Sequence, residues 1–197
     1  MRKCILFSAL LVSTFFLHAQ IGIKGGLNFA NVTNSSSINA SNRSGFNVGV
    51  FYGSRFRTEL LFSRQGYDYK TNSTSGTVSL DYIMLPQLMS INITKLLMLQ
   101  AGVQMAYLIN AKVDSTTNSG GGNNPYGALM DYYNRFDYGF GFGVELHPYK
   151  GLLIGAKYNF GLGKLYKEAQ SGQMPSFSSV DAKQNLVQLF AGWRFGK

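Results

Sequence analysis

Apolar and polar residues alternate without exception in one stretch of the chain, residues 136–146. Its even positions carry six large apolar residues, and its odd positions carry an aspartate, a glutamate and three glycines. A period of two places the large apolar side chains on one face of a β-strand and the charges and glycines on the other. Since a solvated face usually carries long polar side chains, we interpret the glycine-rich face as pointing into a narrow barrel and the apolar face as meeting lipid.

Alternation recurs in seven further segments, each long enough for the roughly 9 to 11 residues of a tilted membrane strand. The eight predicted strands span residues 21–32, 45–53, 56–65, 78–91, 97–110, 136–147, 152–161 and 185–195. In residues 78–91 both faces are apolar, and Pro86 predicts a bulge because proline cannot donate to a strand ladder. We assign five apolar residues to the inner faces of the strands: Phe51, Leu61, Ile83, Leu85 and Phe190.

The connections between these strands alternate between short and long. The short ones are residues 54–55, 92–95 and 148–151, and the long ones are residues 33–44, 70–77, 114–134 and 163–183. Short periplasmic turns and long extracellular loops are typical of outer-membrane barrels. We therefore predict an all-β protein, an eight-stranded antiparallel up-and-down transmembrane β-barrel with both termini in the periplasm.

Aromatic residues should collect at the two membrane interfaces. The predicted topology places Tyr52, Phe56, Trp193 and Phe195 at the periplasmic rim. Toward the outer rim it places Tyr82, Tyr107, Phe136, Tyr138, Tyr158 and Phe160.

The N-terminus has the organisation of a secretory signal peptide. Arg2 and Lys3 precede an apolar run, and the residues that follow predict cleavage after Ala19. A membrane anchor is the weaker alternative, because the apolar run of about 13 residues is shorter than the roughly 20 that a spanning helix needs. We expect residues 1–19 to be a signal peptide and residues 20–197 to form one barrel domain in the Gram-negative outer membrane.

Cysteine content and charge exclude several classes of function. The single cysteine, Cys4, lies in the predicted signal peptide, so the mature chain lacks thiols for disulfides or metal sites. The formal net charge is +9, yet no Lys/Arg cluster or basic helix accompanies it, and nucleic-acid binding is not expected. We instead expect contact with outer-membrane lipid and the anionic groups of lipopolysaccharide.

Charged residues of both signs fall on the predicted inner faces, where a low dielectric requires that they be paired. We predict a structural ion-pair network in the lumen formed by Lys24, Arg57, Glu59, Glu145, Lys157 and Arg194. The enzymatic alternative, in which Glu59 and Glu145 act as an acid/base pair, is disfavoured by these basic neighbours.

Other site motifs also favour structural interpretations. A hydrolase site needs its serine and histidine within hydrogen-bond reach, but Ser63 and His147 are predicted to lie roughly 15 to 20 Å apart along the barrel axis. The glycines of residues 139–143 lack the GxGxxG spacing and the strand-to-helix context of a nucleotide loop. One mature histidine without cysteines does not make a metal site. We predict no catalytic, cofactor-binding or metal-ligating residue.

Six sequence pieces, taken in order, carry a family resemblance. They are IGIKGGLNFANV (21–32), ELLFSRQG (59–66), LDYIMLPQLM (80–89), LQAGVQMAYLI (99–109), DYGFGFGVEL (137–146) and GAKYNFGLGKL (155–165). Together they resemble PorT-like outer-membrane β-barrel proteins over essentially the whole mature chain. The resemblance implies an integral outer-membrane barrel, usually without an assigned biochemical activity, and some relatives belong to secretion and gliding machinery. It supplies no catalytic motif.

Outer-membrane barrels commonly end on an aromatic residue that the barrel-assembly machinery reads. We expect this chain to contact that machinery through Trp193 and Phe195 of its last strand, although Gly196 and Lys197 follow them.

An eight-stranded barrel has an interior just wide enough for side chains to fill, so a diffusion pore for nutrients is not expected. We predict a non-enzymatic envelope scaffold or adhesion protein that contacts other envelope proteins through its extracellular loops. The alternatives are an accessory component of secretion or gliding machinery, a narrow solute or ion channel, and a lipid-modifying enzyme. A soluble lipocalin-type barrel, with its large apolar residues inside, is the alternative at the level of the fold.

The loop of residues 114–134 contains the candidate contact residues. After a flexible SGGGNN segment it carries Tyr126, Leu129, Met130, Tyr132 and Tyr133. Exposed apolar clusters commonly mark contact sites, and tyrosine provides contact area at low entropic cost. We predict that these residues bind a partner. The alternative is that they fold over the barrel mouth or rest at the lipid interface.

Overall fold

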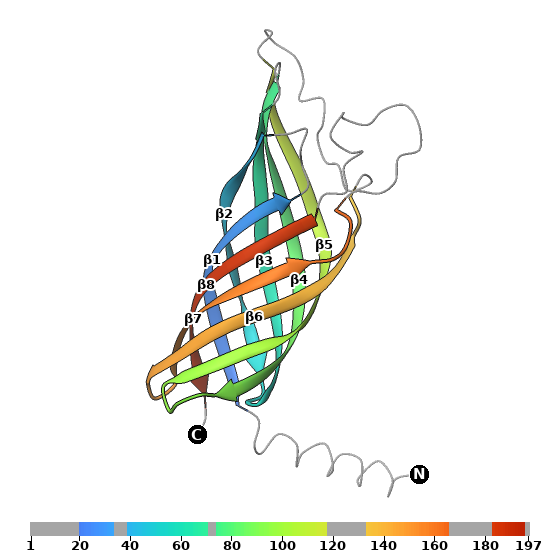
Figure 1. Ribbon diagram of the computed structural model, residues 1–197. Coiled ribbons are helices and arrows are strands. Elements are labelled where there is room, and N and C mark those ends of the chain that lie inside the picture. Colours follow the sequence, from blue (N-terminus) through green and yellow to red (C-terminus); the bar gives the residue numbers. More distant parts are fainter. Residues whose placement is uncertain (1–19, 34–38, 71–73, 118–132, 166–182, 196–197) are drawn as a thin grey trace, which may run out of the picture.

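The computed structural model describes residues 20–33, 39–70, 74–117, 133–165 and 183–195. These residues form eight antiparallel strands that close into one barrel, each strand pairing with the next and the last with the first (Figure 1). The strands are β1 (Ile21–Thr33), β2 (Asn39–Tyr52), β3 (Phe56–Lys70), β4 (Thr74–Asn92), β5 (Leu97–Thr117), β6 (Phe136–Tyr149), β7 (Leu152–Gly161) and β8 (Lys183–Phe195). The predicted up-and-down barrel is confirmed. Within the described residues, no helix is long and apolar enough to cross a membrane.

Every strand exposes large apolar side chains on the outside of the barrel. In residues 136–146 of β6 the exposed side chains are the six predicted to meet lipid: Phe136, Tyr138, Phe140, Phe142, Val144 and Leu146. Nine of the ten predicted interface aromatics are also exposed: Tyr52, Phe56, Tyr107, Phe136, Tyr138, Tyr158, Phe160, Trp193 and Phe195. This arrangement matches the lipid-facing band and aromatic girdles of an outer-membrane barrel, and not the inverted pattern of a soluble lipocalin-type barrel.

Large side chains pack inside the barrel. Phe51, Leu153 and Phe190 form a buried cluster toward the end with the short turns, which we place in the periplasm. The rings fit because neighbouring strands carry glycine beneath them: a Cβ on Gly155 would lie 2.6 Å from the Phe190 ring. A second apolar cluster toward the extracellular end includes Leu61, Tyr82, Met84, Leu108 and Leu186.

Strand β4 has the opposite phase from the one predicted. Ile83 is exposed on the outer face and Leu85 lies on the same face, whereas Tyr82 is buried in the lumen and donates a hydrogen bond to Gln184. Three predictions were therefore wrong, because a strand that is apolar on both faces gives no signal for which face is inside.

The bulge predicted at Pro86 was also wrong in its position. Pro86 stays in register opposite Gln104, and the β4–β5 register shifts instead at Asp81 and Tyr82, which face Asn110 and Leu108. Ile109 is the extra residue in β5, so the alternation reverses beyond it. Beyond it, Asn110 donates a hydrogen bond to Asp81 on the outer face.

Three long connections are shorter than predicted, because strand pairing continues into segments that are polar on both faces. β2 begins at Asn39, β4 at Thr74, and β5 runs to Thr117. As a result β5 has 21 residues, whereas β7, which is not extended, has 10. β2 to β5 extend well beyond the other strands on the side opposite the two termini (Figure 1). The β5–β6 pairing ends at Tyr107 and Phe136.

Candidate functional site

The inward charges of the lumen form the candidate site, and they gather into two clusters. The alternation of each strand turns these side chains inward, and the register of the closed barrel then decides which of them meet. The first cluster joins β1, β3 and β7, and the second joins β3, β5 and β6.

Glu59 is the centre of the first cluster and binds two lysines. Lys24 Nζ lies 3.0 Å from both carboxylate oxygens of Glu59, and Lys157 Nζ lies 2.7 Å from Oε2. All three side chains are buried. Lys24 Nζ also lies 3.8 Å from the centroid of the Phe190 ring, a cation–π contact that offsets part of its lost hydration. The cluster carries two positive charges and one negative charge.

Glu145 is the centre of the second cluster. Arg57 binds it with both terminal nitrogens, at 2.6 and 3.0 Å, in the bidentate geometry that makes such pairs strong. Gln100 donates a hydrogen bond to Glu145 Oε2 at 3.2 Å, and His147 Nε2 lies 2.9 Å from Oε1. The Arg57 guanidinium stacks over the Phe51 ring at 4.7 Å. Glu145 thus accepts three hydrogen bonds, two from Arg57 and one from Gln100.

Arg194 is the one predicted network residue that the structure separates from these clusters. Its guanidinium donates a hydrogen bond to Gln20 at 3.0 Å and, in the described part of the chain, forms no ion pair. Gln100 and His147, which lie against Glu145, are not among the predicted network residues. His147 follows Glu145 by two residues, so the strand period already placed it on the same face.

A layer of buried amides lies next to the charges. Asn28 donates to Ser63 Oγ at 2.8 Å and accepts hydrogen bonds from Asn47 and Gln188, and Gln188 in turn accepts one from Asn159. Glycines make room for this layer: a Cβ on Gly141 would lie 2.9 Å from the side-chain oxygen of Asn159. Ser63 is thereby bound to amides, and His147 belongs to the Glu145 cluster.

The lumen is tightly filled at its extracellular end as well. Gln65, Tyr82, Gln104, Asp137 and Gln184 surround a cavity of about 10 Å³, enough for about one water molecule. Within the described residues no group of three or more acidic, histidine or cysteine side chains could hold a metal ion. The arrangement therefore acts as a polar plug, in which each of the two carboxylates is paired with at least one basic side chain.

Of the predicted contact residues in the long loop, Tyr133 lies within the described residues, whereas Tyr126, Leu129, Met130 and Tyr132 lie outside them. Tyr133 is buried in the extracellular apolar cluster, and its hydroxyl lies 3.4 Å from that of Tyr67. The prediction that Tyr133 is exposed for a partner was wrong. Its position matches the alternative in which this end of the loop folds into the barrel mouth.

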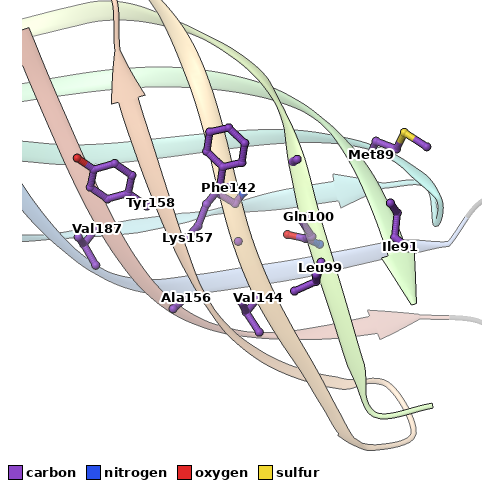
Figure 2. A pocket seen from close by; sticks show the side chains of 12 residues that line it. Met89, Ile91, Leu99, Gln100, Phe142, Val144, Ala156, Lys157, Tyr158 and Val187 are labelled. Carbon is purple, nitrogen blue, oxygen red and sulfur yellow. The ribbon is translucent and has the colours of Figure 1, made fainter. Parts of the chain in front are cut away.

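A separate groove of about 610 Å³ lies on the outer wall (Figure 2). Its lining is apolar and includes Leu99, Phe142, Val144 and Tyr158, whose side chains are exposed on the lipid-facing side. The groove forms where small residues, among them Ala156, lie between these larger ones. In a membrane this surface meets lipid chains, and Gln100 and Lys157 also contribute to its lining.

Two solved structures share this architecture. Ail, the attachment invasion locus protein of Yersinia pestis, solved in complex with the heparin analogue sucrose octasulfate, is 16% identical. The match covers 90% of this chain and 99% of Ail, with a TM-score of 0.50. Neisserial surface protein A is 15% identical, with 90% and 97% of the two chains covered and a TM-score of 0.50. At such low identity these likenesses show the fold alone.

No curated protein sequence matches the chain. The model of one protein family does, over residues 13–167, and that family is described as the outer membrane protein beta-barrel domain. Its match covers most of the chain, from within the predicted signal peptide to six residues beyond the end of β7, and it agrees with the apolar exterior of the barrel. The chain therefore belongs to the family of outer membrane protein beta-barrel domains.

Proposed function

We propose that this protein is a non-enzymatic interaction protein of the outer membrane, a scaffold or adhesin that contacts other envelope components through its extracellular side. One observation carries the proposal: the described lumen is packed with buried ion pairs, amides and rings, while β2 to β5 continue beyond the barrel. A closed interior leaves the outer surfaces and the rims as the parts that can act on other molecules.

The lumen chemistry favours this role over the alternatives of a channel or an enzyme. Glu59 and Glu145 each bind two basic side chains, so neither is poised to accept a proton from a substrate. A conducting path would have to pass the Phe51 and Phe190 rings and then both ion-pair clusters, all of which are buried. These features favour a structural plug over a passage.

The PorT-like resemblance supports a second version of the proposal, in which the partner is part of a secretion or gliding machinery. The contact residues would still lie on a rim or a loop. We also retain the proposal that the barrel-assembly machinery reads β8, where Trp193 and Phe195 are exposed near the strand end.

The loop of residues 114–134 offers a direct test. Since Tyr133 is buried, it should be kept while the other four candidates, Tyr126, Leu129, Met130 and Tyr132, are replaced together by serine. A matched control replaces Ile93 and Leu96, which are exposed in the turn between β4 and β5 at the opposite end. Both variants should show the heat-dependent gel mobility of a folded barrel.

Envelope proteins that cross-link to and co-purify with the wild type should be lost from the loop variant and kept by the control. If the loop variant keeps every partner, the loop is not the contact site. A loss of folding in the loop variant would instead support the structural alternative, in which these residues close the barrel mouth.

A further inference from the structure

A cluster of polar side chains lies on the outer face of β2 to β5, where an apolar surface would be expected. We call it the outer basic cluster, and its members are Arg43, Arg64, Ser79, Asp81, Asn110 and Lys112. Strand register arranges most of it in two rows. Arg64 faces Asp81, which faces Asn110, and in the next row outward Ser79 faces Lys112.

The inner row is internally neutralised. Arg64 donates to both carboxylate oxygens of Asp81, at 2.7 and 3.0 Å, and Asn110 donates to Asp81 Oδ2 at 3.1 Å. The Asp81 side chain is 7% exposed beneath these neighbours, whereas that of Arg64 is 49% exposed. The single negative charge of the cluster is thus already bound.

The outer row itself holds no carboxylate; the next row outward on the same face holds Asp68, which faces Thr77 and accepts a hydrogen bond from it at 2.8 Å. Arg43 reaches across Gly66 to donate to Ser79 Oγ at 3.1 Å, and its Cδ would lie 3.3 Å from a Cβ on that glycine. Lys112 is exposed on the other side of Ser79. Within the described residues neither Arg43 nor Lys112 forms an ion pair. Three cations and one carboxylate give the cluster itself a net charge of +2, and Asp68 in the adjacent row brings the local net charge to +1.

The height of the cluster matches that of lipid headgroups. Its inner row lies directly above apolar side chains: the Arg64 guanidinium lies 5.5 Å from the centroid of the Phe46 ring, and Phe46 packs on Phe62. Tyr107 and Ile109 are exposed on the adjacent stretch of β5. Basic side chains with apolar stems commonly sit at this boundary, where their charges reach the headgroup region.

We propose that Arg43, Ser79 and Lys112 bind a phosphate group of an outer-leaflet glycolipid of the lipopolysaccharide type. Two unneutralised cations flank one hydroxyl, and a phosphate oxygen can accept hydrogen bonds from all three. Because Gly66 has no side chain, Arg43 can reach across it to Ser79. The proposal names a lipid ligand, goes beyond the proposed protein-contact function and does not depend on it.

The test measures binding of the refolded mature protein to lipid A carrying its phosphates and to dephosphorylated lipid A. The variant R43Q/K112Q removes both flanking charges. The control K95Q/K150Q removes the same charge from two exposed lysines in the turns at the other end of the barrel. Folding of each variant is checked by heat-dependent gel mobility, and K112Q alone, on an exposed side chain, serves if the double variant does not fold.

We expect R43Q/K112Q to lose roughly tenfold or more in affinity for phosphorylated lipid A, since a hydrogen bond to a charged group is worth at least that much. The control variant should bind like the wild type, and dephosphorylated lipid A should bind weakly to every variant.

If R43Q/K112Q and K95Q/K150Q lose the same affinity for phosphorylated lipid A, the effect comes from the total charge of the protein and the proposed site is wrong. Unchanged binding by R43Q/K112Q or by K112Q would also overturn the site. If inorganic phosphate alone displaces lipid A at comparable concentrations, the site takes free phosphate and the lipid assignment is wrong. If R43Q/K112Q still co-purifies with the protein partners of the wild type, the proposed contact function holds whichever of these binding results is obtained.

Discussion

Glu59 holds two buried ammonium groups at once, so its removal leaves more uncompensated charge than the loss of an ordinary ion pair. Glu59→Ala should lower the free energy of unfolding by about 3 to 5 kcal/mol, the usual cost of breaking a buried pair. Glu59→Gln should cost less, because it keeps the volume and a hydrogen-bond acceptor. Denaturant unfolding in lipid vesicles, followed by the fluorescence of the single tryptophan, Trp193, measures both.

Wild-type stability in Glu59→Ala would contradict this structural role. So would the loss of a measurable activity without a loss of stability, since that outcome would make Glu59 a functional residue.

Depth in the membrane gives a second test at the level of single residues. Phe140 and Phe136 are both exposed on the outer face of β6, but Phe136 is its first residue and lies near the outer rim. Phe140→Arg should cost roughly 2 to 4 kcal/mol, and Phe136→Arg much less, because the cost of a charge falls toward the interfaces. Folding yields into lipid, read from heat-dependent gel mobility, give the comparison. Equal costs at the two positions would contradict the placement of β6.

At the scale of the strand, the extra residue in β5 determines which side chains reach the outside. Asn110→Cys and Lys112→Cys should react with a water-soluble maleimide on the folded barrel, whereas Ala111→Cys should not, because Ala111 is buried. The wild type is a clean background, since Cys4 lies in the predicted signal peptide. A reactive residue 111 between two protected neighbours would mean that β5 has no bulge at Ile109.

The limits of the sequence pattern are also clearest at the level of strands. Alternation located all eight strands, and it assigned the faces of β6 correctly because large apolar residues and glycines differ so strongly. It failed in β4, where both faces are apolar, and in the outer parts of β2, β4 and β5, where both faces are polar. The bulge at Ile109 leaves no trace in the pattern, since one added residue only reverses the order of the faces beyond it.

For the candidate site, the sequence predicted which charged side chains point into the lumen but not which of them meet. An inward position follows from the period of two, and that placed Lys24, Glu59 and Lys157 in the lumen. Their contacts depend on the relative height of β1, β3 and β7 around the closed barrel, which no local pattern contains. Arg194 has the same inward phase but lies close to the end of β8, and it meets Gln20 instead of a carboxylate.

For the whole molecule, the packed lumen predicts electrical behaviour. The wild-type barrel should show no steady ion conductance in planar bilayers, because the Phe51 and Phe190 rings and two ion-pair clusters occupy its cross-section. The variant F51A/F190A, which removes the two buried rings near the periplasmic end, tests whether the ion-pair clusters alone also block ion flow. A stable single-channel current from the wild type would favour the channel alternative over the proposed interaction protein.

Because its strands differ in length, the barrel has a taller wall on one side than on the other. Among the described strands, the wall that a molecule meets from the membrane surface is taller where β2 to β5 continue outward than at β7, the 10-residue strand. Neighbours in the membrane therefore find a different barrier in each direction. The contacts that this protein can make with a neighbour therefore depend on how the barrel is rotated about the membrane normal. In a barrel whose strands all had the same length, that rotation would make little difference.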